Sequence, residues 1–161
     1  MKALINKENA PLPISNELIE LLTNVISSKQ LNPDELNNIT INFRDDTYTP
    51  TMGGYLPVEV NLVKKLNDKF SFDYITDFCY VGSGFNTELT KEIDFDFTNG
   101  VGFQLYSGHH KLTELSELFL LWQSNFIEYV EQDIFTPKAK TTFNFTYMDR
   151  SNNHLTPLNS N

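Results

Sequence analysis

The stretch FSFDYITDFCYV, residues 70–81, decides the fold. Side chains with a period of two are typical of an extended strand, whose successive residues point to opposite faces of a sheet. One predicted face carries Phe70, Phe72, Tyr74, Thr76, Phe78 and Tyr80, and the other carries Ser71, Asp73, Ile75, Asp77, Cys79 and Val81. Because apolar residues occur on both faces from Ile75 to Val81, the pattern predicts a central strand covered on both sides.

The same period of two recurs before and after this stretch. It predicts further strands over residues 38–44, 56–62, 92–97, 101–105 and 142–147. Asn67-Asp68 and Asn99-Gly100 are turn dipeptides, and the second predicts that residues 92–106 form a hairpin. Gly108 closes this hairpin, and Gly82-Ser83-Gly84 ends the central strand.

Two segments show helical spacing instead. Ile14, Leu18, Leu22 and Val25 predict a helix that ends near Lys29, with Ser15 or Asn16 as its N-cap. A longer apolar stripe follows Thr113, its expected cap, and continues to Val130; Pro137 ends this region. A short turn at residues 32–35 delivers the chain into the first strand.

These elements predict an α+β fold, with a mostly antiparallel sheet of five or six strands and two main helices packed on one face. At 161 residues, the chain is expected to form a single domain over residues 1–161. The expected ordered core spans about residues 14–148, between polar N-terminal and C-terminal tails.

Composition excludes several classes of protein. The net charge is −9, and residues 68–96 and 114–133 contribute −5 each, so direct binding to nucleic acid is not expected. A single cysteine, no signal peptide and no apolar run of membrane-spanning length predict a cytoplasmic protein without membrane attachment.

Several of these segments together resemble a small bacterial domain family of unknown function. The resemblance spans about residues 38–135 in the same order, and it implies a small single-domain bacterial protein without any activity or site to carry over. It rests on Phe43-Arg44-Asp45, Gly53-Gly54-Tyr55, Pro57-Val58-Glu59, the run from Asp73 to Phe78, the run from Lys91 to Phe97, Gly100-Val101-Gly102, the run from Gln104 to Gly108, and Leu121-Trp122.

Carboxylates form the most prominent candidate site. If the acidic faces of neighbouring strands meet, their oxygens could hold a divalent cation, or raise the pKa of one carboxyl for acid catalysis. We favour the simpler interpretation that these acids lie on a solvent-exposed sheet face. The candidates are Asp73, Asp77, Glu92, Asp94 and Asp96.

A second set of candidates lies in the loop after the first strand. Loops between rigid strands often carry function, and Arg44 could bind a carboxylate or phosphate, although a salt bridge to a nearby acid is the favoured interpretation. The loop candidates are Arg44, Asp45, Tyr48 and Tyr55. Tyr55, Tyr80 or Tyr106 is expected near a surface cleft, whereas Cys79 is expected to be an inert core thiol. His109-His110 is not expected to bind a metal, because neighbours on a strand point apart.

No complete catalytic constellation is present, and we therefore expect a non-catalytic protein-interaction or regulatory module that binds a protein partner or forms a homo-oligomer. One alternative is an enzyme that depends on a small ligand or a divalent metal and uses the carboxylate cluster. A further alternative is an acidic decoy of a DNA-binding protein. No cofactor is assigned, with a divalent cation as the one candidate.

Overall fold

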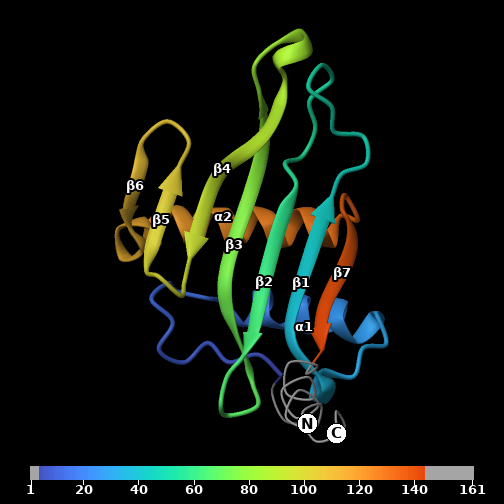
Figure 1. Ribbon diagram of the computed structural model, residues 1–161, viewed down its shortest axis with the longest axis vertical. Helices are drawn as coiled ribbons and strands as arrows, with labels where there is room; N and C mark the ends of the chain where they lie inside the picture. The colour runs from blue at the N-terminus through green and yellow to red at the C-terminus, as the bar shows by residue number, and fades with distance from the viewer. Residues whose placement is uncertain (1–3, 144–161) are drawn as a thin grey trace, which may run out of the picture.

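The computed structural model describes residues 4–143, which form a seven-stranded sheet with two α-helices on one face (Figure 1). The strands are β1 (Leu36–Arg44), β2 (Val58–Lys64), β3 (Phe70–Val81), β4 (Glu88–Asp96), β5 (Val101–Gln104), β6 (Gly108–Lys111) and β7 (Thr136–Phe143). The helices are α1 (Asn16–Ser28) and α2 (Ser116–Glu131), with short 3₁₀ helices η1 (Pro33–Glu35), η2 (Gly84–Asn86) and η3 (Leu112–Leu115).

The strand order is β6-β5-β4-β3-β2-β1-β7, and every neighbouring pair is antiparallel. This arrangement confirms the α+β class, the antiparallel sheet and the hairpin between β4 and β5. The expected count of five or six strands was wrong, because β6 was missed. Its sequence, Gly-His-His-Lys, has no apolar alternation that could indicate a strand.

The predicted assignment of β3 residues to the two faces of the sheet was wrong, because the strand contains a β-bulge. Asn61 pairs with Tyr74 while Leu62 pairs with Phe72, so Asp73 is an extra residue in β3. The extra residue reverses the alternation within the strand. Phe70 and Phe72 therefore share the helix-covered face with Ile75 and Asp77, which are all buried, and not with Tyr74.

The core lies between the sheet and the two helices. Phe43, Phe95 and Phe119 are fully buried there, and the rings of Phe95 and Phe119 pack edge to face. Gln123 of α2 is also buried, and its amide accepts from the Ser15 backbone N–H and donates to the Pro13 carbonyl. This contact fixes the start of α1 against α2.

The ends of the elements differ in part from the sequence pattern. Ser15 caps α1 by accepting from the Leu18 N–H, as predicted. In contrast, Thr113 does not cap α2, because η3 precedes that helix. The packed part of the chain also begins before residue 14, since Ile5 and Leu12 are buried and Ile5 bridges to Phe70.

The last strand begins earlier than predicted. It starts at Thr136 and includes Pro137, which was expected to end the preceding region. Proline is tolerated here because β7 is an edge strand, where a missing backbone N–H breaks no ladder on the outer side. The predicted strand residues 144–147 lie outside the described residues.

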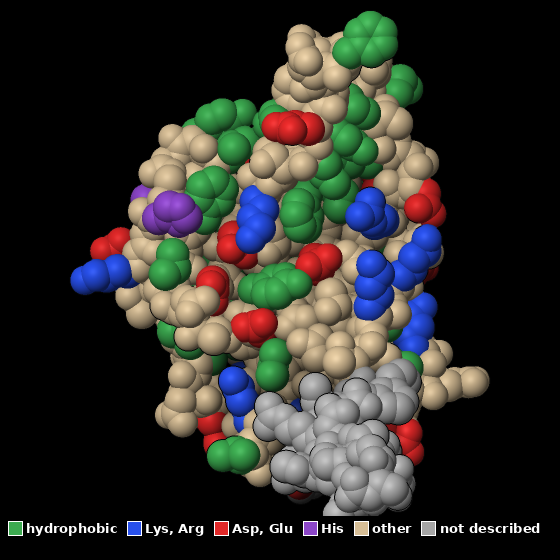
Figure 2. Space-filling model, in the orientation of Figure 1, with side chains coloured by type: hydrophobic (Ala, Val, Ile, Leu, Met, Phe, Trp, Pro, Cys, Tyr) green, Lys and Arg blue, Asp and Glu red, His purple; other side chains and the backbone are tan. Residues whose placement is uncertain are grey.

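The face of the sheet away from the helices carries charged, polar and hydrophobic side chains together (Figure 2). Acidic side chains lie over its middle strands, and several basic side chains lie toward the β7 edge (Figure 2). Asn61 and Asn38 exchange side-chain hydrogen bonds there, and the Tyr74 hydroxyl donates to Glu59 at 2.5 Å. Asn61 and Thr76 are buried on this face, and many of its polar groups bond to one another.

Candidate functional site

A pocket opens where α2 crosses the ends of β2 and β3, next to the loop that joins β1 to β2. Its volume is about 370 Å³, at the lower end of the range for small-ligand pockets. The lining residues come from four separate segments of the chain. They are Gly54, Tyr55, Leu56, Val58, Asp77, Trp122, Asn125, Phe126, Tyr129 and Phe135.

Asp77 is the one carboxyl among these lining residues, and only 6% of its surface is exposed. Its Oδ1 accepts from the Ile93 backbone N–H at 2.8 Å, and its Oδ2 accepts from the indole N–H of Trp122 at 3.2 Å. The register shifts at this point, between Asp77 and Phe78. The carboxylate therefore pairs with a backbone group at a bulge and also ties α2 to the sheet.

Burial raises the pKa of Asp77 to about 7. Loss of hydration is the largest cause, and the nearby negative charge of Glu92 adds to it. The hydrogen bonds from Ile93 and Trp122 favour the ionised form and oppose part of this shift. Asp77 consequently changes its charge close to neutral pH.

Five of the ten lining residues are aromatic. Trp122 stacks on Phe126 with ring centroids 5.0 Å apart, and Tyr55 packs edge to face on Tyr129 at 4.7 Å. Phe135 lies next to Phe126 at 5.9 Å. The pocket thus presents flat apolar surfaces around a single carboxyl group.

The loop that places Tyr55 is held by Asp45. This carboxylate accepts from the hydroxyl and backbone N–H of Thr47 and from the Tyr55 N–H, and these bonds lower the pKa of Asp45. Gly54 has a φ of 140°, and a side chain there would overlap Asp45 and Tyr48. Tyr48 in turn packs on Tyr80 of β3.

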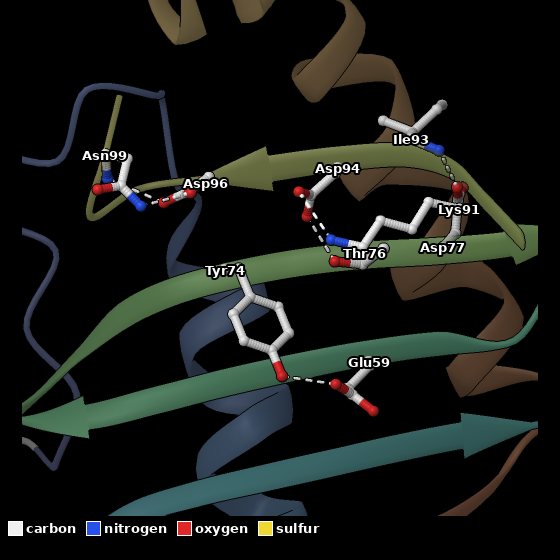
Figure 3. Close-up of polar contacts among 9 residues, drawn as sticks. All are labelled: Glu59, Tyr74, Thr76, Asp77, Lys91, Ile93, Asp94, Asp96 and Asn99. Carbon is white, nitrogen blue, oxygen red and sulfur yellow. Dashed lines mark hydrogen bonds and ion pairs between the residues drawn. The ribbon is translucent and has the colours of Figure 1, made fainter. Parts of the chain in front are cut away.

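The other predicted site residues are dispersed. Asp94 accepts from Thr76 at 2.5 Å and pairs with Lys91 at 3.3 Å, whereas Asp96 bonds to Asn99 (Figure 3). These contacts are separate from the one between Asp77 and Ile93 in the same view.

The predicted carboxylates therefore do not meet at one point. Asp73 bonds to Thr98, and Glu92 lies at the bulge opposite Asp77. Within residues 4–143, no group of three or more His, Cys, Asp or Glu side chains is placed to hold a metal ion. Arg44 is exposed and forms no ion pair with a described residue.

Cys79 and the two histidines of the described residues, His109 and His110, also lie apart from the pocket lining. Burial raises the pKa of the Cys79 thiol, with the charges of Glu92 and Asp77 as further causes. His110 contacts the Ser107 hydroxyl at 2.8 Å, and His109 packs on Phe103. Of the three tyrosines expected near a cleft, Tyr55 lines the pocket, and Tyr80 and Tyr106 do not.

One end of the sheet carries several exposed apolar side chains. We call this region the loop end; it comprises residues 45–57 and 80–89, which contain the connections β1 to β2 and β3 to β4 (Figure 1). Phe85 and Met52 are 109% and 83% exposed, and Tyr55 is 39% exposed at the pocket mouth. Exposed apolar groups clustered beside a pocket are typical of interaction sites.

The fold and the pocket define a class of protein: a small α+β domain with a meandering antiparallel sheet, helices on one face, and an aromatic pocket between sheet and helix. The family described as "Protein of unknown function (DUF2787)" matches residues 16–140. The chain belongs to this family, in agreement with the resemblance in its sequence. No curated protein was found to be similar to the chain.

Two solved structures from Vibrio cholerae are similar to this chain. A hypothetical protein of the VSP-II pathogenicity island is 32% identical, with a TM-score of 0.74 over 84% of this chain and 99% of its own. A conserved hypothetical protein of the island VPI-2 is 34% identical, with a TM-score of 0.73 over 83% and 98%. The latter is described as sharing structural homology with the human P32 protein.

Among the described helices, none is both long enough and apolar enough to cross a membrane. The sequence analysis named Asp77 and Tyr55 as candidates, but it named none of Trp122, Tyr129 and Phe135 as a site residue. The signal available was Asp77 itself, an acid within the most apolar strand of the chain.

Proposed function

We propose that this protein is a non-catalytic protein-interaction domain, which binds its partner at the loop end and anchors one partner side chain in the aromatic pocket. The observation that carries the proposal is the aromatic pocket itself, which surrounds one carboxyl group beside exposed apolar loops. Buried aromatic pockets that receive one side chain are typical binding hot spots.

The pocket lining supports binding more than catalysis. A nucleophilic mechanism pairs the nucleophile with an adjacent base or another activating group. Asp77 is the only carboxyl among the lining residues, and none of them is a histidine, cysteine, serine or lysine. The volume of about 370 Å³ suits one side chain of a partner.

The loop end supports a protein as the partner. Phe85 and Met52 leave large apolar surfaces in water, where covering each Å² of apolar surface is worth roughly 25 cal/mol. These side chains project from the same end of the sheet as the pocket mouth.

Site-specific photo-crosslinking in cells of the source organism tests this proposal. A photoreactive amino acid replaces Phe85, Tyr55 or Leu66 in turn; Leu66 is the matched control, because it is 107% exposed in the β2–β3 turn at the opposite end. We expect the same crosslinked species from Phe85 and Tyr55 and none from Leu66. Equal crosslinking at all three positions, or none at the loop end, would contradict the proposal.

A further inference from the structure

We propose that the group received by the pocket is the guanidinium of an arginine side chain, paired with Asp77 and stacked between aromatic rings. This inference rests on the proposed function and adds the chemistry of the anchor. It combines three properties of the pocket: the sign of its charge, the free acceptor positions of its carboxyl group, and the flat shape of its walls.

The charge of the pocket favours a cation. Its lining contains the acid Asp77 and no arginine or lysine. Glu92 of β4 adds a second negative charge next to Asp77, and the Cys79 thiol and the phenol groups of Tyr55 and Tyr129 also lie in its surroundings. A bound cation would offset the cost of keeping the Asp77 carboxylate ionised at a site where 94% of its surface is removed from water.

The carboxyl group retains capacity for two more hydrogen bonds. An ionised carboxylate offers about four acceptor positions. Ile93 occupies one on Oδ1 and Trp122 occupies one on Oδ2, so each oxygen keeps one acceptor position. A guanidinium can donate to both oxygens of a carboxylate at once, which a point-like ammonium cannot do.

The aromatic walls match the rest of an arginine side chain. Guanidinium planes stack on aromatic rings, and a cation within about 6 Å of a ring centre is attracted by the ring face. Trp122, which bonds to the Asp77 carboxyl group, and Tyr55 and Tyr129 supply such rings in the pocket lining. A neutral side chain would fill the same space but would leave the Asp77 charge unpaired.

The test uses three probes with the unmodified protein: the N-acetyl methylamides of arginine, citrulline and lysine. Citrulline has nearly the shape of arginine without its charge. Trp122 is the only tryptophan of the chain, so its fluorescence and its single indole N–H resonance report on the pocket alone. We expect arginine to bind at least tenfold more tightly than citrulline, and more tightly than lysine.

The affinity for the arginine probe should also rise with pH. With a pKa of about 7, the ionised fraction of Asp77 increases about tenfold between pH 6 and pH 8, and the affinity should follow it. Asp77→Asn should remove both the preference for arginine and the pH dependence. Asp94→Asn, which changes the same group on the opposite face of the sheet, should leave both unchanged.

Each outcome has a defined meaning. Equal binding of arginine and citrulline overturns the cationic anchor but leaves the interaction domain in place, because crosslinking at the loop end tests that separately. Equal binding of lysine and arginine overturns the guanidinium. The absence of any response at Trp122 to the arginine probe overturns the inference as a whole. None of these comparisons depends on the folding of a variant.

Discussion

The buried carboxyl group of Asp77 makes the stability of the protein depend on pH in a direction opposite to that of most paired carboxylates. In the folded state the pKa of Asp77 is raised to about 7, compared with the ordinary value of 3.8 that applies in the unfolded chain. The folded state therefore binds this proton more tightly than the unfolded state. Stability from this group is fully present below pH 3.8 and is lost as the pH rises to 7.

The size of the effect follows from the two pKa values. They differ by about 3 units, and each unit corresponds to about 1.4 kcal/mol, so ionisation of Asp77 should lower the free energy of unfolding by about 4 kcal/mol. For a domain of this length, about 4 kcal/mol moves the melting temperature by roughly 8–16 °C. Asp77→Asn removes the titrating group.

The assay is urea unfolding of the native protein and of Asp77→Asn from pH 4 to pH 8. The difference between the free energies of unfolding of the two proteins should change by about 4 kcal/mol over this range, so that the variant becomes relatively more stable as the pH rises. Asp45→Asn is the control expected to give a nearly flat difference over this range, because hydrogen bonds lower the pKa of Asp45 and its contribution is already present above pH 3.8. A flat difference for Asp77→Asn, or a carboxyl carbon resonance of Asp77 that titrates near pH 4, would refute the reasoning.

Three further substitutions test the packing. A methyl group added by Gly102→Ala would overlap the Leu115 side chain, so we expect a loss of about 1–3 kcal/mol in urea unfolding, reduced when Leu115→Ala is combined with it. Gln123→Ala leaves two backbone groups unpaired and should cost about 2 kcal/mol or more, with early hydrogen exchange at the start of α1; an unchanged unfolding midpoint would contradict this. Burial and the hydrogen bond to Glu59 raise the pKa of Tyr74 far above its usual range. The absorbance titration curve of Tyr74→Phe should therefore lack the phenol that ionises at the highest pH in the native protein. Identical curves for the two proteins would contradict this assignment.

Periodicity predicted the elements in which apolar side chains face the core and polar side chains face solvent. The alternation in β1, β2 and β5 and the Asn99-Gly100 turn were sufficient to predict a mostly antiparallel sheet but not its strand order, and the helical stripes located both helices. The bulge at Asp73 could not be predicted, because an inserted residue changes the face of a strand without changing its composition. The start of the edge strand β7 was predicted too late in the chain. The N-terminal half of this strand contains Pro137 and two lysines, and it lacks the residues typical of buried strands.

The pocket was accessible to sequence reasoning only in part. Asp77 was identifiable as an acid in an apolar strand. Its partners Tyr55, Trp122 and Phe135 lie tens of residues away, and pattern alone placed Trp122 in a helix stripe typical of a core. Only the crossing of α2 over the sheet brings these side chains together, and single-sequence periodicity carries no information about such crossings.

The strand order has a consequence for the sequence of folding events. From β1 to β6, each strand pairs with the next one along the chain. These pairings join segments that are close in sequence, so they can form as soon as the segments leave the ribosome. β7 instead returns to β1, where Thr136 pairs with Arg44 across the whole meander and α2. Closing so long a loop is slow relative to a hairpin. We therefore expect the β1 edge to stay open during synthesis until residues 136–143 emerge, and a nascent chain stalled before them to be open to pairing with other strands.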